Sequence, residues 1–225
     1  RRPLNLSIAV DVSGSMSGEK IATVREAMNV MVDRLTEADT LSLIAFESNS
    51  RVLLEPTAMD EDGRTALSEA IDNLQAGGGT DIEAGLADAY SMVSPTADSE
   101  GVEDRVMLLT DAQPNTGGTG MDTFMGMARF YSAAGIGISV FGVGLDLGSE
   151  LASEISNLPG GNSFYLADEE DIRQIFDEEF DYVVTPLGYN LDVEIAASEA
   201  LSIGQTWATP SDPQDESIVF GASTL

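Results

Sequence analysis

Polar oxygens gather in three short segments of the chain, each after an apolar or glycine-rich stretch. The first is Asp11-Val12-Ser13-Gly14-Ser15, which places one carboxylate and two hydroxyls after the apolar run 4–10. The second holds Thr80, which follows three glycines, and the third holds Asp111, which follows the apolar run 105–110. Such oxygens are hard ligands that suit a small divalent cation, Mg²⁺ first and Ca²⁺ or Mn²⁺ next, rather than zinc or copper. The predicted metal ligands are Asp11, Ser13, Ser15, Thr80 and Asp111.

Amino-acid composition excludes most catalytic chemistry. The chain has no cysteine and no histidine, which removes thiolate metal sites, Cys nucleophiles, His-ligated zinc and Ser-His-Asp triads. Lys20 is the single lysine and hence the single candidate for a Schiff base. A phosphoryl-transfer enzyme with Asp11 as nucleophile is one alternative, but a second acid would be expected where Ser13 stands. We therefore expect a protein that is not an enzyme.

The net charge of −29 limits the partners that the chain can bind. Nucleic acids and anionic membrane surfaces would be repelled, and no apolar run is long enough to span a bilayer. The acids are spread along the chain, which favours a solvated surface adapted to high salt over a surface that collects Ca²⁺. Composition does not fix the compartment, although an extracellular or cell-surface setting is favoured.

Short apolar runs and longer amphipathic stretches alternate over the first 184 residues. This pattern is typical of a parallel sheet with helices on both faces. We predict an α/β fold with a doubly wound, mostly parallel central sheet of the Rossmann-like kind. The expected strands are 4–11, 40–46, 51–54, 105–110, 136–143 and 164–166, and the expected helices are 19–35, 60–74, 81–93, 119–134, 148–158 and 168–184. In such a sheet, loops after the carboxyl ends of neighbouring strands meet at one crevice, which would bring the three oxygen-bearing segments together.

The pattern changes after Pro186. Apolar and polar residues alternate over 187–196, as in a half-buried antiparallel strand, and 217–220 forms a second strand candidate. Two strands cannot bury a core of their own. We therefore divide the chain into a domain at 1–185 and a β-rich tail at 186–225. The tail either belongs to a flanking β-sandwich completed by sequence outside this chain or pairs with the first domain.

The chain resembles a known protein family. Over about residues 3–184 the order of elements is similar to that of a von Willebrand factor type A domain, and the five predicted ligands match its metal-ion-dependent adhesion site. The resemblance implies that Ser13, Ser15 and Thr80 are direct or near-direct ligands, with Asp11 and Asp111 as ligands or as partners of ligands. Ala112 departs from the Gly that many members carry there. The glycine-rich loop and the tail resemble bacterial or archaeal members flanked by a β-sandwich.

Hydroxyl ligands carry no charge, so an ion held mainly by them lacks compensating negative charge and can accept an anionic oxygen from outside. The expected function is a non-enzymatic, cation-dependent protein-binding module for adhesion or assembly, in which a partner's acidic side chain completes the metal. The family also supplies an alternative: an adaptor subunit of an AAA+ chaperone or metal-chelatase complex. A third possibility is that these Asp, Ser and Thr residues are only turn and N-cap residues, with no metal.

Overall fold

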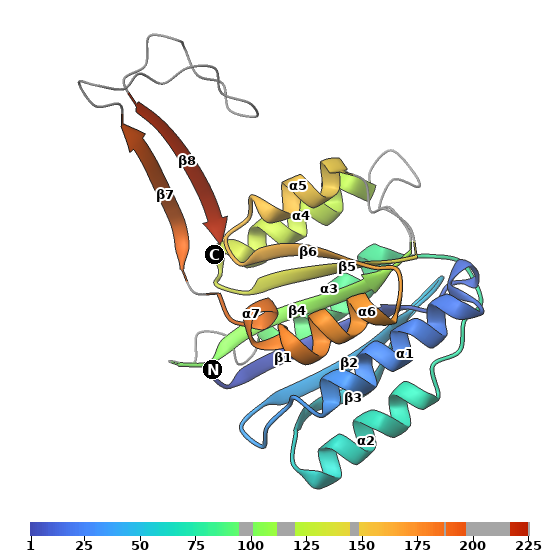
Figure 1. Cartoon of the computed structure of the whole chain (residues 1–225). Helices are drawn as coiled ribbons and strands as arrows, with labels where there is room; N and C mark the ends of the chain where they lie inside the picture. Colours follow the sequence, from blue (N-terminus) through green and yellow to red (C-terminus); the bar gives the residue numbers. More distant parts are fainter. Residues whose placement is uncertain (95–100, 112–119, 145–148, 187, 197–216, 225) are drawn as a thin grey trace.

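The central feature of the fold is a six-stranded sheet (Figure 1). The computed structural model describes residues 1–94, 101–111, 120–144, 149–186, 188–196 and 217–224. The strand order is β3-β2-β1-β4-β5-β6, and every neighbouring pair is parallel except β2 with β3. This arrangement confirms the predicted mostly parallel α/β sheet. The strands are β1 (Leu4–Asp11), β2 (Thr40–Phe46), β3 (Ser50–Ala58), β4 (Glu103–Thr110), β5 (Gly137–Val143) and β6 (Gly161–Leu166).

Helices cover both faces of the sheet, and alternate strand residues supply the two cores. In β1, Leu6 and Ile8 pack on one side while Ala9 packs on the other, as the alternating direction of strand side chains requires. Helices α1, α2, α6 and α7 lie over the first face and α3, α4 and α5 over the second (Figure 1). Their bounds are α1 (Glu19–Val32), α2 (Glu61–Asp72), α3 (Ile82–Val93), α4 (Gly120–Ala133), α5 (Ser149–Ser156), α6 (Glu169–Ile172) and α7 (Phe180–Val184).

The predicted single helix over 168–184 is wrong in detail. A π-helical segment, η3 (Arg173–Glu178), separates α6 from α7, and the Glu179 N–H donates to the Gln174 carbonyl five residues back, at 2.8 Å. Residues spaced four apart drift around an α-helix, and one wider turn compensates for that drift. As a result Ile172, Phe176 and Phe180 all remain buried against the sheet.

Other expected boundaries shift less. The helix expected over 19–35 ends at Val32, where Arg34 and Leu35 donate to carbonyls only three residues back. The short strands expected at 51–54 and 164–166 extend to Ser50–Ala58 and Gly161–Leu166. Each is an edge strand, so its apolar stretch is shorter than its hydrogen-bonded length.

The tail forms a separate two-stranded antiparallel ribbon, β7 (Tyr189–Ala196) with β8 (Ser217–Thr224). Figure 1 shows the ribbon projecting from the main sheet, with the end of β8 near β6. In the described part of the chain, β7 and β8 pair with each other and not with the six-stranded sheet. The division into domains at residue 185 stays a prediction.

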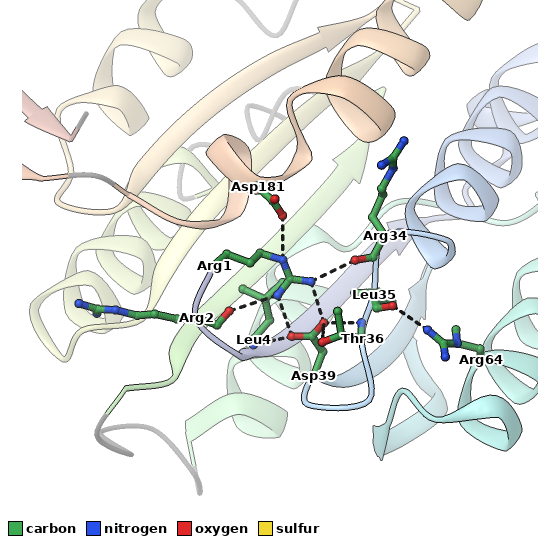
Figure 2. A network of polar contacts seen from close by, with 9 residues as sticks. All are labelled: Arg1, Arg2, Leu4, Arg34, Leu35, Thr36, Asp39, Arg64 and Asp181. Carbon is green, nitrogen blue, oxygen red and sulfur yellow. Dashed lines mark hydrogen bonds and ion pairs between the residues drawn. The ribbon is translucent and has the colours of Figure 1, made fainter.

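A polar network closes the end of the sheet at which β1 and β2 begin (Figure 2). Asp39 is 0% exposed and accepts two hydrogen bonds of 2.7 Å from the Arg1 guanidinium. It also accepts the backbone N–H groups of Leu4 and Thr36, at 2.8 and 2.7 Å. Arg1 in turn reaches Asp181 of α7 at 2.9 Å. One carboxylate therefore joins the starts of two strands to the last helix.

Candidate metal centre

Asp11 is the last residue of β1 and is 0% exposed. Its Oδ1 accepts the Ser13 N–H at 2.8 Å, and its Oδ2 accepts the Thr110 hydroxyl at 2.7 Å. Burial raises the pKa of the Asp11 carboxyl, hydrogen bonds from Thr110 and Ser13 oppose the rise, and the nearby charge of Asp111 adds to it. Asp11 therefore fixes the first loop against the end of β4 with both of its oxygens.

A chain of oxygen contacts continues from the first loop to Asp111. The Ser13 and Ser15 Oγ atoms lie 3.0 Å apart, and the Ser15 hydroxyl donates to Asp111 Oδ1 at 2.8 Å. Because Asp11 bonds the Ser13 N–H as well, four of the five predicted ligands belong to one connected group. They come from the ends of β1 and β4, which are neighbours in the sheet.

Thr80 lies on an adjacent loop, as predicted, but is not part of this connected group. The two loops are joined through their backbones: Gly77 N–H donates to Val12 O at 2.7 Å, and Gly14 N–H donates to Gly78 O at 3.1 Å. The Thr80 side chain is exposed, and within the described residues no hydrogen bond links it to the other four predicted ligands. The structure thus brings the loops together without bringing all five oxygens into contact.

Sequence reasoning missed one residue of the site, Lys20 in the first turn of α1. Its ammonium forms an ion pair and hydrogen bond with Asp111 Oδ2, the oxygen that Ser15 does not use. A signal was available in the sequence, because a single lysine among 39 acidic residues follows the oxygen-rich segment by five residues. On sequence alone, Lys20 is only a candidate amine for a Schiff base.

Comparison with known proteins gives the family. The family model described as von Willebrand factor type A domain matches residues 5–178, more than three quarters of the chain. This chain belongs to the von Willebrand factor type A family. An uncharacterized Synechocystis protein, sll0103, is 30% identical over 183 residues, which cover 80% of this chain and 41% of that protein.

Solved structures agree with the vWA fold. A von Willebrand factor type A protein from Catenulispora acidiphila has a TM-score of 0.70 at 18% identity, covering 99% of this chain and 55% of that one. The pilus adhesin SpaC from Lactobacillus rhamnosus GG, in its open conformation, has a TM-score of 0.65 at 14% identity, covering 100% and 37%. This vWA chain thus spans between a third and three fifths of the length of each of these three proteins.

The donor set of the vWA site suits a hard cation, because every candidate atom is a carboxylate or hydroxyl oxygen. It contains only two carboxylates, Asp11 and Asp111. Among the described residues no group of three or more Asp, Glu, His or Cys side chains could hold a metal ion, so an ion at this site would depend on hydroxyls.

Ala112, the expected departure from the family pattern, lies outside the described residues. No helix in the described ranges has the length and apolar character needed to cross a bilayer.

Gly78 offers a test of how the two vWA loops are held. It has φ of +81°, and a Cβ there would lie 1.6 Å from the Glu47 Oε2 atom. We expect Gly78→Ala to lower the free energy of unfolding by about 1–2 kcal/mol, because a left-handed backbone is unfavourable for alanine and the Glu47 carboxylate must move. Urea unfolding measures the loss.

Gly77→Ala is the matched control. Its φ is not in the left-handed region, and a Cβ there meets no atom within 4 Å. Equal unfolding free energies for the two variants would show that the loop does not need the conformation described.

Proposed function

We propose that this vWA domain binds partner proteins through a divalent cation, Mg²⁺ first, with an acidic side chain of the partner completing the coordination of the ion. The observation that carries the proposal is the connected group of Ser13, Ser15 and Asp111 oxygens at the ends of β1 and β4. The Ser13 and Ser15 hydroxyls and the Asp111 carboxylate would hold the ion, and Thr80 would add a ligand from the neighbouring loop. The ion would act as a bridge between two proteins and not as a catalyst.

The charges at the site support an external anionic ligand. Ser13 and Ser15 contribute neutral oxygens, and both oxygens of Asp11 already accept hydrogen bonds. Asp111 contributes a single negative charge, half of what a divalent ion carries. An ion here would keep much of its positive charge, and Mg²⁺ commonly retains exchangeable positions that a carboxylate can take.

Family membership supports the coarser part of the proposal. Domains of the von Willebrand factor type A family act as protein-interaction modules, and a pilus adhesin shares this fold. The activity of the whole protein to which the domain belongs is a further proposal: adhesion or assembly at a cell surface.

Metal uptake tests the proposal directly. We expect isothermal titration calorimetry to detect Mg²⁺ binding to the wild-type chain and Ser15→Ala to weaken it by on the order of tenfold, because the variant removes one hydroxyl and frees Asp111 Oδ1. Ser17→Ala is the matched control, since the exposed Ser17 follows two residues later outside the connected group. No uptake of Mg²⁺, Mn²⁺ or Ca²⁺ by well-folded wild-type protein would contradict the proposal.

Acetate can serve as the probe for the partner's carboxylate. We expect it to shift the backbone amide NMR signals of Gly14 and Ser15 when Mg²⁺ is present and to leave them unchanged in EDTA. With a net charge of −29, the protein should bind acetate more tightly as salt rises to about 0.15 M, where the Debye length falls to about 8 Å. Equal shifts in Mg²⁺ and in EDTA would show that no ion mediates the contact.

A further inference from the structure

We propose that Lys20 is a built-in competitor of the divalent cation: its ammonium occupies the Asp111 carboxylate in the ion-free domain and is displaced when the ion binds. The inference rests on the proposed function, because it assigns a regulatory residue to the same site. It makes the cation affinity of the domain a balance between an ion from solution and a positive charge carried by the chain.

The contact geometry places Lys20 at the atom that the ion would use. Asp111 has a side chain that is 2% exposed, with Oδ1 accepting the Ser15 hydroxyl and Oδ2 facing the Lys20 ammonium. Together the hydroxyl and the ammonium engage both carboxylate oxygens. A cation that takes Asp111 as ligand must approach one of these two oxygens, and of the two partners already there only the ammonium repels it.

The fold holds the lysine side chain in this direction. Gly144, just after β5, has φ of +74°, and a Cβ at this position would lie 3.3 Å from the Lys20 Cε and 3.5 Å from its Cγ. The aliphatic part of Lys20 thus crosses the end of β5 where no side chain stands in its way. This placement comes from two different elements, α1 and β5, and not from the local sequence alone.

A hollow beside α1 can accept the displaced ammonium. Lys20 lines a hollow of about 470 Å³ between α1 and the ends of β5 and β6, together with the acidic residues Glu19 and Glu26. Its side chain is 28% exposed, so rotation into this hollow keeps the ammonium hydrated. Two carboxylates there can take over as neighbours of the positive charge.

Neutralising Lys20 should therefore raise cation affinity. We expect Lys20→Met and Lys20→Gln to bind Mg²⁺ about tenfold more tightly than wild type in calorimetry, a value kept small because the ion pair is partly exposed to water. Arg129→Met is the matched control: it removes one positive charge from an exposed pair with Glu154 between α4 and α5 and should change the Mg²⁺ affinity less than twofold.

A second measurement uses the wild-type protein. Because Lys20 is the single lysine, protein labelled with [ε-¹³C]lysine gives one lysine signal. We expect Mg²⁺ to shift this signal with the dissociation constant found by calorimetry, since the ammonium leaves Asp111. This readout decides the matter if neither Lys20 variant folds, and a signal that Mg²⁺ leaves unmoved overturns the inference.

The outcomes separate this inference from the proposed function. Tighter Mg²⁺ binding by both Lys20 variants than by wild type supports it. If wild type binds Mg²⁺ but the variants bind equally or more weakly, the inference is overturned and the proposed function stands. If Arg129→Met tightens binding as much, the effect belongs to net charge and the inference is overturned. If neither wild type nor variants bind, both proposals fail.

Discussion

Replacing Arg105 with methionine is expected to lower the free energy of unfolding by about 3–5 kcal/mol, because the change breaks a buried ionic network. Arg105, in β4, is 0% exposed. Its guanidinium donates to the Ser139 hydroxyl at 2.9 Å, to the Gly160 carbonyl at 3.0 Å and to the Val184 carbonyl at 3.0 Å. One side chain thus joins β4 to β5, to the turn before β6 and to α7. Urea unfolding followed by circular dichroism measures the loss.

The loss caused by Arg105→Met should depend on pH through Glu103. Burial raises the pKa of the Glu103 carboxyl, and Arg105, 3.6 Å away, opposes the rise. A carboxyl with a raised pKa in the fold favours the folded state most when it is protonated, so stability falls as pH rises from the unfolded value of about 4.3 toward the folded pKa. Removing Arg105 raises that pKa further, and the variant's deficit should be smaller at pH 5 than at pH 7.

Glu103→Gln in the Arg105→Met background supplies the matched test. The amide cannot ionise, so the double variant should recover part of the stability lost at pH 7 and lose the pH dependence of the deficit. A deficit that stays the same from pH 5 to pH 7 in the single variant would show that Glu103 does not respond to Arg105.

Asp39→Asn is the second change with a large expected effect, also about 3–5 kcal/mol. Asp39 accepts five hydrogen bonds, from the Arg1 guanidinium, the Leu4 and Thr36 amides and the Thr36 hydroxyl. An asparagine would turn one acceptor oxygen into an NH₂ group that faces donors, and it would leave Arg1 without its buried counter-charge (Figure 2). Urea unfolding at pH 7 measures the effect.

The stability lost in Asp39→Asn should depend on pH through the Asp39 carboxyl, whose pKa is shifted in the opposite direction to that of Glu103. Burial alone would raise the pKa of Asp39, but hydrogen bonds from Arg1, Thr36 and Leu4 outweigh burial and lower it. A lowered pKa stabilises the fold above the unfolded value of about 3.9, and this contribution is lost as pH falls through the folded pKa. The difference between wild type and Asp39→Asn should therefore shrink below pH 4.

Asp181→Asn is the control for Asp39→Asn. It removes the other carboxylate partner of Arg1, but its side chain is 67% exposed, and we expect a cost below about 1 kcal/mol. Equal costs for the two variants would mean that burial of Asp39 does not decide the strength of the contact.

Much of the fold could be predicted from the sequence, because the apolar pattern that marks each strand or helix lies within one short segment of the chain. Continuous apolar runs such as 105–110 belong to strands covered on both faces, and the acids that begin helices, Asp60 and Asp81, accept the N–H groups of Gly63 and Ala84 as N-caps do. Loops after parallel strands meet at one edge, so the neighbourhood of Asp11 and Asp111 followed from topology.

The rest depends on contacts between distant residues, which no local pattern records. Lys20 meets Asp111 across 91 positions and Arg1 meets Asp39 across 38. The single lysine after the oxygen-rich segment was a signal for the first pair, but nothing in the flanking sequence marks the second. The π-helical turn at Arg173–Glu178 keeps Ile172, Phe176 and Phe180 buried, although the acid-rich sequence suits a plain helix. Thr80 was predicted as a ligand because its hydroxyl follows three glycines, but its distance from Ser13 depends on loop backbone that residue types do not fix.

The two buried ionic networks lie where the strands begin, whereas the oxygen-bearing loops lie where they end. Several residues of each strand separate Asp39 and Arg105 from the rim that carries Ser13, Ser15 and Lys20. Side-chain substitutions on that rim, apart from loop glycines such as Gly78, should accordingly alter the proposed ion binding while the free energy of unfolding stays nearly unchanged. This separation makes the scaffold suitable for engineering. New loops could be grafted where the strands end without redesign of the ionic networks where the strands begin.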